Sequence, residues 1–216
     1  MLLDRSGSMI NIREATVAGI NEFIVKQQST PGEATLKLIQ FDDYPRDLSY
    51  NCTLDGNLKE INPLELSQFV PRGGTPLYDA MGKAIDELGV ELNSLSENER
   101  PGKVVFCIIT DGYENASKKF SSEQIKEKVE HQTNKYNWQF TYIGANQDAI
   151  LVGNTLGIDA IKCMSYSADS DHTVNAFSGV SGMTTRLRNT KDLASLRSIS
   201  YTKGERDSSL KEEDHA

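Results

Sequence analysis

The sequence predicts an α/β fold in which a mostly parallel, doubly wound sheet carries helices on both faces. Helical and strand-like segments alternate along most of the 216 residues, which is the pattern of such folds. The run KVVFCIIT, at residues 103–110, is almost continuously apolar, as expected of a central parallel strand that is covered on both sides. At residues 48–54 a short turn is followed by strict apolar and polar alternation, which predicts one antiparallel edge strand.

The expected elements follow one another in a regular order. Strand patterns fall at residues 1–3, 35–41, 48–54, 103–110, 138–144 and 160–164. Apolar residues recur at helical spacing within residues 12–28, 77–95, 121–136, 149–156 and 174–187. Ser121 and Gln124 have the spacing of a capping box at the start of the third of these helices. This order is that of a Rossmann-like sheet built from strand–helix–strand units.

The apolar pattern predicts one domain over residues 1–187. Residues 188–216 are polar and charged without a face for a core, so we expect a flexible C-terminal tail. Only three residues precede Asp4, which leaves the first strand short. We therefore expect either that the natural chain extends beyond Met1 or that a neighbouring element compensates.

Composition excludes several classes of function. With 38% hydrophobic and 25% charged residues, and no apolar run near the roughly 20 residues of a membrane helix, we expect no membrane span. The net charge of −8 leaves no excess of Lys and Arg to neutralise phosphates, so nucleic acid is not an expected partner. Cys52, Cys107 and Cys163 are too few and too far apart for a disulfide framework, and no secretory signal pattern is present. We expect reduced thiols buried in strands, in a cytoplasmic protein.

Three polar clusters occur where a predicted strand gives way to a loop. They contain Asp4, Ser6 and Ser8 in DRSGSM, Thr75 in GGTPLYDA, and Asp111 in ITDG. The carboxyl ends of parallel strands share one edge of a doubly wound sheet, so these five side chains are expected to converge. Carboxylate and hydroxyl oxygens without Cys or His suit a hard cation such as Mg²⁺, with Mn²⁺ or Ca²⁺ as other possibilities.

These motifs, in this order and spacing, resemble the metal-ion-dependent adhesion site of von Willebrand factor type A domains. The pattern D-x-S-x-S, then T, then D is complete at Asp4, Ser6, Ser8, Thr75 and Asp111. The resemblance covers the chain from its start to about residue 187. It implies that the five residues hold a divalent ion, with the hydroxyls as direct ligands and the aspartates acting directly or through water.

The same resemblance implies a function. Neutral hydroxyl ligands leave the cation under-compensated, so it attracts a Glu or Asp carboxylate from outside. The expected function is therefore that of a metal-dependent protein–protein interaction module that binds an acidic side chain of a partner protein, and not that of an enzyme.

Three other interpretations remain open from the residues alone. Ser6, Ser8 or Thr75 can be a helix cap, and Pro76 suits the first position of a helix. A metal-dependent phosphohydrolase with Asp4 as nucleophile is the main functional alternative, although the second acid such a site requires is missing. The metal can also be purely structural, in a closed site that offers a partner no coordination position.

Residues beside the motifs receive simpler interpretations. Asp42 and Asp43 are expected to form a turn, and a position bordering the site is the alternative. Tyr113, Glu114 and Asn115 follow Asp111 on one loop, and we expect them at the rim, where they influence the choice of partner.

Overall fold

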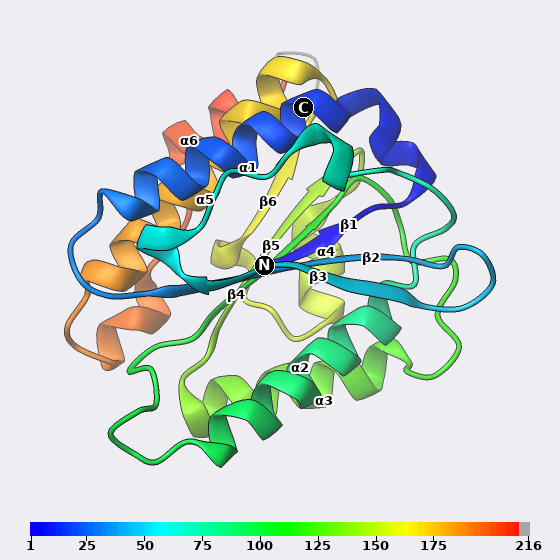
Figure 1. The fold of residues 1–216 in the computed structure, drawn as a ribbon. Coiled ribbons are helices and arrows are strands. Elements are labelled where there is room, and N and C mark those ends of the chain that lie inside the picture. Colours follow the sequence, from blue (N-terminus) through cyan, green and yellow to red (C-terminus); the bar gives the residue numbers. More distant parts are fainter. Residues whose placement is uncertain (212–216) are drawn as a thin grey trace.

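The computed structural model describes residues 1–211 and contains one six-stranded sheet in the order β3-β2-β1-β4-β5-β6 (Figure 1). Only the β2 and β3 pair is antiparallel; the other neighbouring strands are parallel. The strands are β1 Leu2–Asp4, β2 Thr35–Asp42, β3 Ser49–Asn57, β4 Val105–Thr110, β5 Gln139–Ala145 and β6 Cys163–Tyr166. The predicted doubly wound sheet with one antiparallel edge strand is confirmed.

Helices cover both faces of this sheet. They are α1 Arg13–Gln28, α2 Leu77–Ser94, α3 Ser122–Tyr136, α4 Ala149–Thr155, α5 Ser170–Asn189 and α6 Lys203–Ser208. Helices α1, α5 and α6 lie on one side of the sheet, and α2 and α3 lie on the other (Figure 1). Among residues 1–211, none of these helices has the length and apolar character that crossing a membrane requires.

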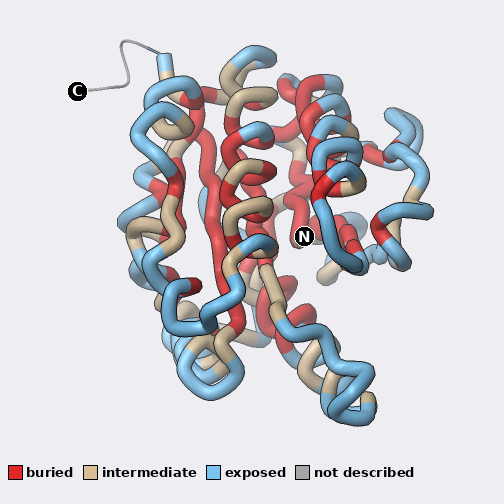
Figure 2. Tube along the Cα trace, turned by 90° about the vertical axis from the view of Figure 1, so that its left-hand side faces the viewer, coloured by how far each residue is buried: buried red, intermediate tan, exposed pale blue. Residues whose placement is uncertain are grey.

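The three-residue strand β1 lies at the centre of the core. It pairs with β2 on one side and β4 on the other. Leu2 packs into the apolar cluster beneath α2 and α3, and Leu3 packs into the cluster beneath α1 and α5, because successive side chains of a strand point to opposite faces. Figure 2 shows buried residues along the strands and on the helix sides that face them. Two flanking strands and two apolar layers therefore support the short strand.

Local signals in the sequence set most element boundaries. Ser121 and Gln124 form the predicted capping box at the start of α3. Strand β6 begins at Cys163, later than expected, because residues 160–162 form a single 3-10 turn. That turn is capped by the carboxylate of Asp159, which accepts a hydrogen bond from the Ile161 amide.

The segment after residue 187 differs from the expected tail. Leu196 and Tyr201 are 1% and 4% exposed and belong to the core beneath α1 and α5. Thr202 caps α6, and Arg206 in that helix donates hydrogen bonds to the carbonyls of residues 160, 161 and 163. The folded part of the chain therefore continues beyond the expected boundary at residue 187. The segment is bound by a few apolar residues and many polar contacts, and it has no periodic apolar face that would have predicted this. Residues 212–216 of the expected tail lie outside the described residues.

One expectation about the thiols is also wrong. Cys107 in β4 and Cys163 in β6 are buried, but Cys52 in β3 is exposed. Cys52 lies on β3, the outermost strand of the sheet, where a residue can remain accessible. All three cysteines are free thiols.

Candidate functional site

The five predicted site residues lie at the edge of the sheet where the parallel strands end, which is on the right in Figure 1. Asp4 is the last residue of β1. Ser6 directly precedes the 3-10 helix η1, Gly7–Ile12, and Ser8 is the second residue of that helix. Thr75 precedes α2 by two residues, and Asp111 follows β4 directly. The fold thus places all five at one edge, as the parallel topology predicts.

Hydrogen bonds connect four of these residues. Ser8 Oγ donates to Asp111 Oδ1 at 2.6 Å and lies 3.1 Å from Ser6 Oγ. The Ser6 amide donates to Asp4 Oδ1 at 2.7 Å. Thr75 joins them across Gly112, where a Cβ atom would meet Ser8 Oγ at 3.7 Å and Thr75 Oγ1 at 3.8 Å. The predicted oxygens therefore surround one small region of the edge.

Burial makes the two carboxylates of this site unusual. Asp4 is 0% and Asp111 is 7% exposed. Burial raises the pKa of Asp4 to about 7, although hydrogen bonds from Thr110 and Ser6 act in the opposite direction. Burial also raises the pKa of Asp111, against the hydrogen bond from Ser8. Among residues 1–211, no cationic side chain contributes to either shift, so these carboxylates lack a positive partner within the described chain.

Thr110 contributes to the site and was missed in the sequence. Its hydroxyl donates to Asp4 Oδ2 at 2.6 Å and accepts a hydrogen bond from the Gly112 amide at 3.2 Å. Thr110 is the last residue of the apolar run of β4, where a β-branched side chain predicts a position in the core. Its position directly before Asp111 is the only signal in the sequence. Thr110 holds the carboxylate of Asp4 in place from the neighbouring strand.

Asn115 positions Thr75. Its side-chain Oδ1 accepts a hydrogen bond from the Thr75 amide at 2.9 Å, and its own amide donates to the Thr75 carbonyl at 3.2 Å. Both polar groups of the Thr75 backbone are thus fixed by one residue of the loop that follows Asp111. Asn115 is exposed, as expected of a rim residue, and its side chain also holds the Thr75 backbone.

Glu114 is likewise a structural residue. Its Oε2 accepts from the Tyr78 amide at 3.0 Å, and Ser117 Oγ accepts from the Asp79 amide at 3.0 Å. These two loop residues satisfy amides in the first turn of α2 that have no partner within the helix. Tyr113, in contrast, is 61% exposed and remains in the predicted rim position.

The contacts do not support the helix-cap interpretation of the predicted ligands. Helix α2 begins at Leu77, and its first amides are capped by the loop after β4, not by Thr75. The Ser6 side chain makes no capping hydrogen bond to η1. The hydroxyl groups of Ser6 and Ser8 instead face each other and the Asp111 carboxylate.

Asp42 and Asp43 are not simple turn residues. Asp42 ends β2 with 0% exposure, and its Oδ2 forms ion pairs with Arg5 at 2.5 Å and with Arg72 at 3.3 Å. Asp43 Oδ1 accepts from the Gly74 amide at 2.5 Å. Gly73, the residue before Gly74, has a φ of +68°, and a Cβ atom on it would lie 2.5 Å from Asp43 Oδ1. Glycine is therefore required at this position. Both aspartates brace the loops around the site.

The residues present fit a hard divalent cation. Two buried carboxylates without a positive partner and three hydroxyls form an all-oxygen donor set, which suits Mg²⁺ or Mn²⁺. Within residues 1–211, no group of three or more His, Cys, Asp or Glu side chains has the arrangement of a metal site. The predicted set contains only two such residues and relies on hydroxyls for the rest.

Comparisons with known proteins match the chain by structure and not by sequence. No family model and no curated protein matches the sequence. A von Willebrand factor type A structure from Catenulispora acidiphila matches with a TM-score of 0.52 and 11% identity, over 85% of this chain and 41% of that chain. Proximal thread matrix protein 1 from the mussel byssus matches with a TM-score of 0.57 and 14% identity, over 85% and 44%.

The pilus adhesin SpaC from Lactobacillus rhamnosus GG, in an open conformation, matches with a TM-score of 0.61 and 13% identity, over 86% of this chain and 29% of that chain. This chain thus spans less than half the length of each of these three proteins. At these identities, the likeness concerns the fold alone.

Proposed function

We propose that this domain, which has the fold of a von Willebrand factor type A domain, is a protein-interaction module that binds an acidic side chain of a partner through a divalent metal ion. In this proposal Asp4, Ser6, Ser8, Thr75 and Asp111 hold Mg²⁺, and Mn²⁺ or Ca²⁺ can replace it. The ion supplies a Lewis-acidic position that an external carboxylate can occupy.

One observation supports the metal above all others. Asp4 and Asp111 are buried close together, and no Lys, Arg or His pairs with them in the described part of the chain. A buried carboxylate without a cation is costly, because the charged form loses its hydration. A bound divalent ion offsets that cost, and the neighbouring hydroxyls supply further hard ligands.

The exposure of the proposed ligands indicates that a partner could reach the ion from one side. Asp4, Ser6 and Thr75 are 0%, 2% and 2% exposed, whereas Ser8 is exposed. An ion held by these residues is enclosed on the sheet side and open near Ser8. Three of its five protein ligands are neutral, so attraction for an outside carboxylate remains.

The phosphohydrolase alternative receives less support, and we propose that the domain is not an enzyme. Both oxygens of Asp4 accept hydrogen bonds, and the side chain is fully buried, which disfavours nucleophilic attack. Arg5 and Arg72, the cations nearest in sequence to the motifs, both bind Asp42 instead of Asp4. Mg²⁺-dependent hydrolysis of para-nitrophenyl phosphate that is lost in Asp4→Asn would contradict this assignment.

A cytoplasmic location is part of the same proposal. Three free thiols, one of them on the exposed Cys52, suit a reducing compartment. Formation of a Cys52-linked disulfide dimer in the native cell extract, trapped by alkylation, would argue for an oxidising one.

The test of the function uses a defined carboxylate. The Mn²⁺-loaded protein is titrated with the peptide Ac-Gly-Glu-Gly-amide while the relaxation of water protons is measured. The expected result is a fall in relaxivity as the glutamate replaces a water on the ion, with no fall for the matched glutamine peptide. An equal response to both peptides, or none to either at saturation with metal, would overturn carboxylate capture.

A further inference from the structure

The two outer strands of the sheet, β3 and β6, differ in whether other parts of the chain bind their outer backbone groups. Along β6, residues of the C-terminal segment bind the outer backbone groups. Arg206 donates to the carbonyls of residues 160, 161 and 163, Ser209 Oγ donates to the Ser165 carbonyl, and the Ser167 amide donates to the Ser209 carbonyl. That edge is therefore closed by the chain itself.

The edge at β3 has no such cover. Its backbone groups pair with β2 from residue 49 to residue 57. Within the described chain, no other segment forms a backbone hydrogen bond with these residues. Strand β3 lies at the front of the molecule in Figure 1. An open edge strand presents a row of unpaired N–H and C=O groups that can pair with an added strand.

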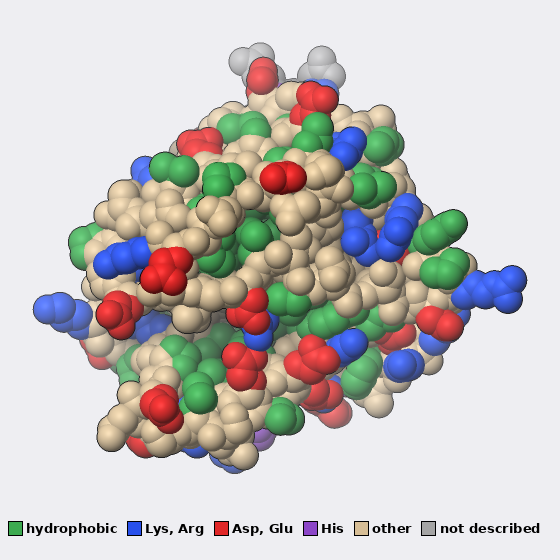
Figure 3. Space-filling model, in the orientation of Figure 1, with side chains coloured by type: hydrophobic (Ala, Val, Ile, Leu, Met, Phe, Trp, Pro, Cys, Tyr) green, Lys and Arg blue, Asp and Glu red, His purple; other side chains and the backbone are tan. Residues whose placement is uncertain are grey.

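A groove runs beside this open edge. It has a volume of about 500 Å³ and lies between the second half of β3, residues 53–57, and the loop of residues 60–68. Its lining includes Glu60 and Glu65 of the loop and Asp55 of the strand. The Asp55 carboxylate is already paired with Lys37 at 3.4 Å, so Glu60 and Glu65 are the acidic groups available to a ligand. Figure 3, which has the orientation of Figure 1, shows acidic side chains on this face together with Lys and Arg side chains.

A buried side chain without a full set of partners lies behind the groove. Gln40 in β2 is 0% exposed, and its Nε2 donates to Thr53 Oγ1 at 2.8 Å and to the Gln68 carbonyl at 3.0 Å. Thr53 and Gln68 both line the groove. The Oε1 atom of the same amide has no hydrogen-bond partner in the described structure. The two hydrogen bonds from Nε2 tie the 60–68 loop to β3 and so fix the inner wall of the groove.

We propose that the β3 edge and this groove bind an extended, lysine- or arginine-rich segment of a partner protein by strand addition. Main-chain hydrogen bonds to β3 supply the common affinity, and basic side chains on one face of the added strand meet Glu60 and Glu65. This site is distinct from the metal site and does not depend on the ion, because its residues belong to β3 and the 60–68 loop.

The probe is the peptide Ac-KTKVKTK-amide, whose binding is measured by fluorescence anisotropy in about 0.1 M salt, with and without chelator. The reverse-charge peptide Ac-ETEVETE-amide is the first control. A version of the basic peptide that is N-methylated on alternate residues is the second, because it keeps the charge and loses the strand hydrogen bonds. Tight binding of the basic peptide is expected to fall about tenfold on N-methylation.

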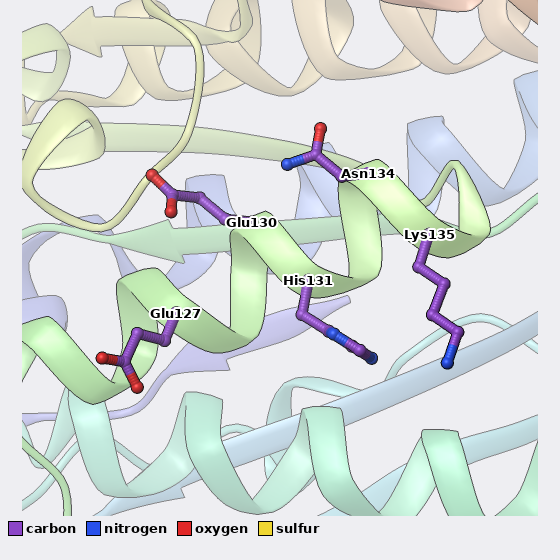
Figure 4. Close-up of a pocket in the computed structure, with 5 residues that line it drawn as sticks. All are labelled: Glu127, Glu130, His131, Asn134 and Lys135. Carbon is purple, nitrogen blue, oxygen red and sulfur yellow. The ribbon is translucent and has the colours of Figure 1, made fainter.

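A matched pair of protein variants separates the groove from general charge attraction. Glu60→Lys alters the groove, and Glu127→Lys makes the same charge change on α3. Glu127 borders a shallow hollow of about 440 Å³ with Glu130, His131, Asn134 and Lys135, and its side chain extends from the helix in Figure 4. We expect Glu60→Lys to weaken binding of the basic peptide about fivefold and Glu127→Lys to leave it unchanged.

Hydrogen exchange locates the added strand. Amides of β3 are expected to become protected when the peptide binds, to the same extent in Asp4→Asn as in the unaltered protein. Equal binding of the N-methylated peptide, or equal weakening by both charge variants, would overturn strand addition. So would a dimer in light scattering whose β3 amides are already protected without peptide, because a second copy would then occupy the edge.

Discussion

Asp4 and Asp42 occupy equivalent places on neighbouring strands and are stabilised in different ways. Each is the last residue of its strand, and each is 0% exposed. Asp42 forms ion pairs with Arg5 and Arg72. Asp4 receives only hydrogen bonds, from Thr110 Oγ1 and the Ser6 amide, and burial raises its pKa to about 7.

The contrast separates a structural carboxylate from a functional one. A buried carboxylate that is paired with arginine contributes to a stable loop framework, because its charge is compensated within the chain. A buried carboxylate without a cation costs stability and is retained where a ligand supplies the charge. Asp111 shares the second condition, which is why Asp4 and Asp111 together indicate a cation site.

The largest expected effect on stability is at Asp42, the carboxylate that is paired with arginine. Asp42→Asn leaves the Arg5 guanidinium, whose side chain is 8% exposed, without its negative partner. We expect the free energy of unfolding to fall by about 3 kcal/mol, measured by urea denaturation. A loss below about 1 kcal/mol, as for a surface ion pair, would remove the contrast.

Asp4→Asn is expected to act in the opposite sense on stability and strongly on the metal. The amide preserves the size of the side chain and removes an uncompensated charge, so metal-free protein should be as stable as the unaltered chain or more stable. Affinity for Mn²⁺ should fall about 100-fold, which is about 2.7 kcal/mol, by calorimetry. Strong destabilisation of the metal-free variant would show that Asp4 is structural in the same way as Asp42.

Asn115→Ala tests whether an uncharged residue that positions Thr75 contributes to metal binding. Loss of its hydrogen bonds releases the Thr75 backbone, so we expect affinity for Mn²⁺ to fall about tenfold, as is usual when a support behind a ligand is removed. Asn134→Ala, on the surface of α3, is the control. An effect on stability alone, with unchanged metal affinity, would mean that Thr75 is not a ligand.

Lys162 extends the comparison to a buried cation. It is 6% exposed, its Nζ donates to Gln139 Oε1 and the Leu196 carbonyl, and burial lowers its pKa to about 8. Between pH 8 and the ordinary lysine value of 10.5, the unfolded chain binds more protons at this residue, so its contribution to stability rises with pH.

Lys162→Met lacks this titration. The stability of the variant relative to the unaltered protein should therefore be highest below pH 8 and decline by about 1 kcal/mol toward pH 10. Urea denaturation at several pH values measures the difference. A pH-independent difference would show that Lys162 keeps its ordinary pKa in the folded protein.

The sequence was sufficient for the sheet, the order of the elements and the convergence of the five motif residues. Period-two and helical patterns report which face is buried, and parallel topology brings strand ends to one edge. It was not sufficient for Thr110, Glu114 and Asn115, because their partners are backbone groups and side chains distant in the chain. Leu196 and Tyr201 were missed because isolated anchors leave no periodic signal.

The most direct test of the metal site is calorimetric titration of metal-stripped protein with Mn²⁺ and Mg²⁺, repeated on the Ser6→Ala/Ser8→Ala double variant. Ser6 does not cap η1, and the two hydroxyls bond each other and Asp111 within the site, so we expect their removal to alter the donor set and leave the fold in place. We expect one metal ion per chain for the unaltered protein and no detectable binding for the variant, with both proteins equally folded by circular dichroism. Equal metal binding by the two proteins would contradict this expectation.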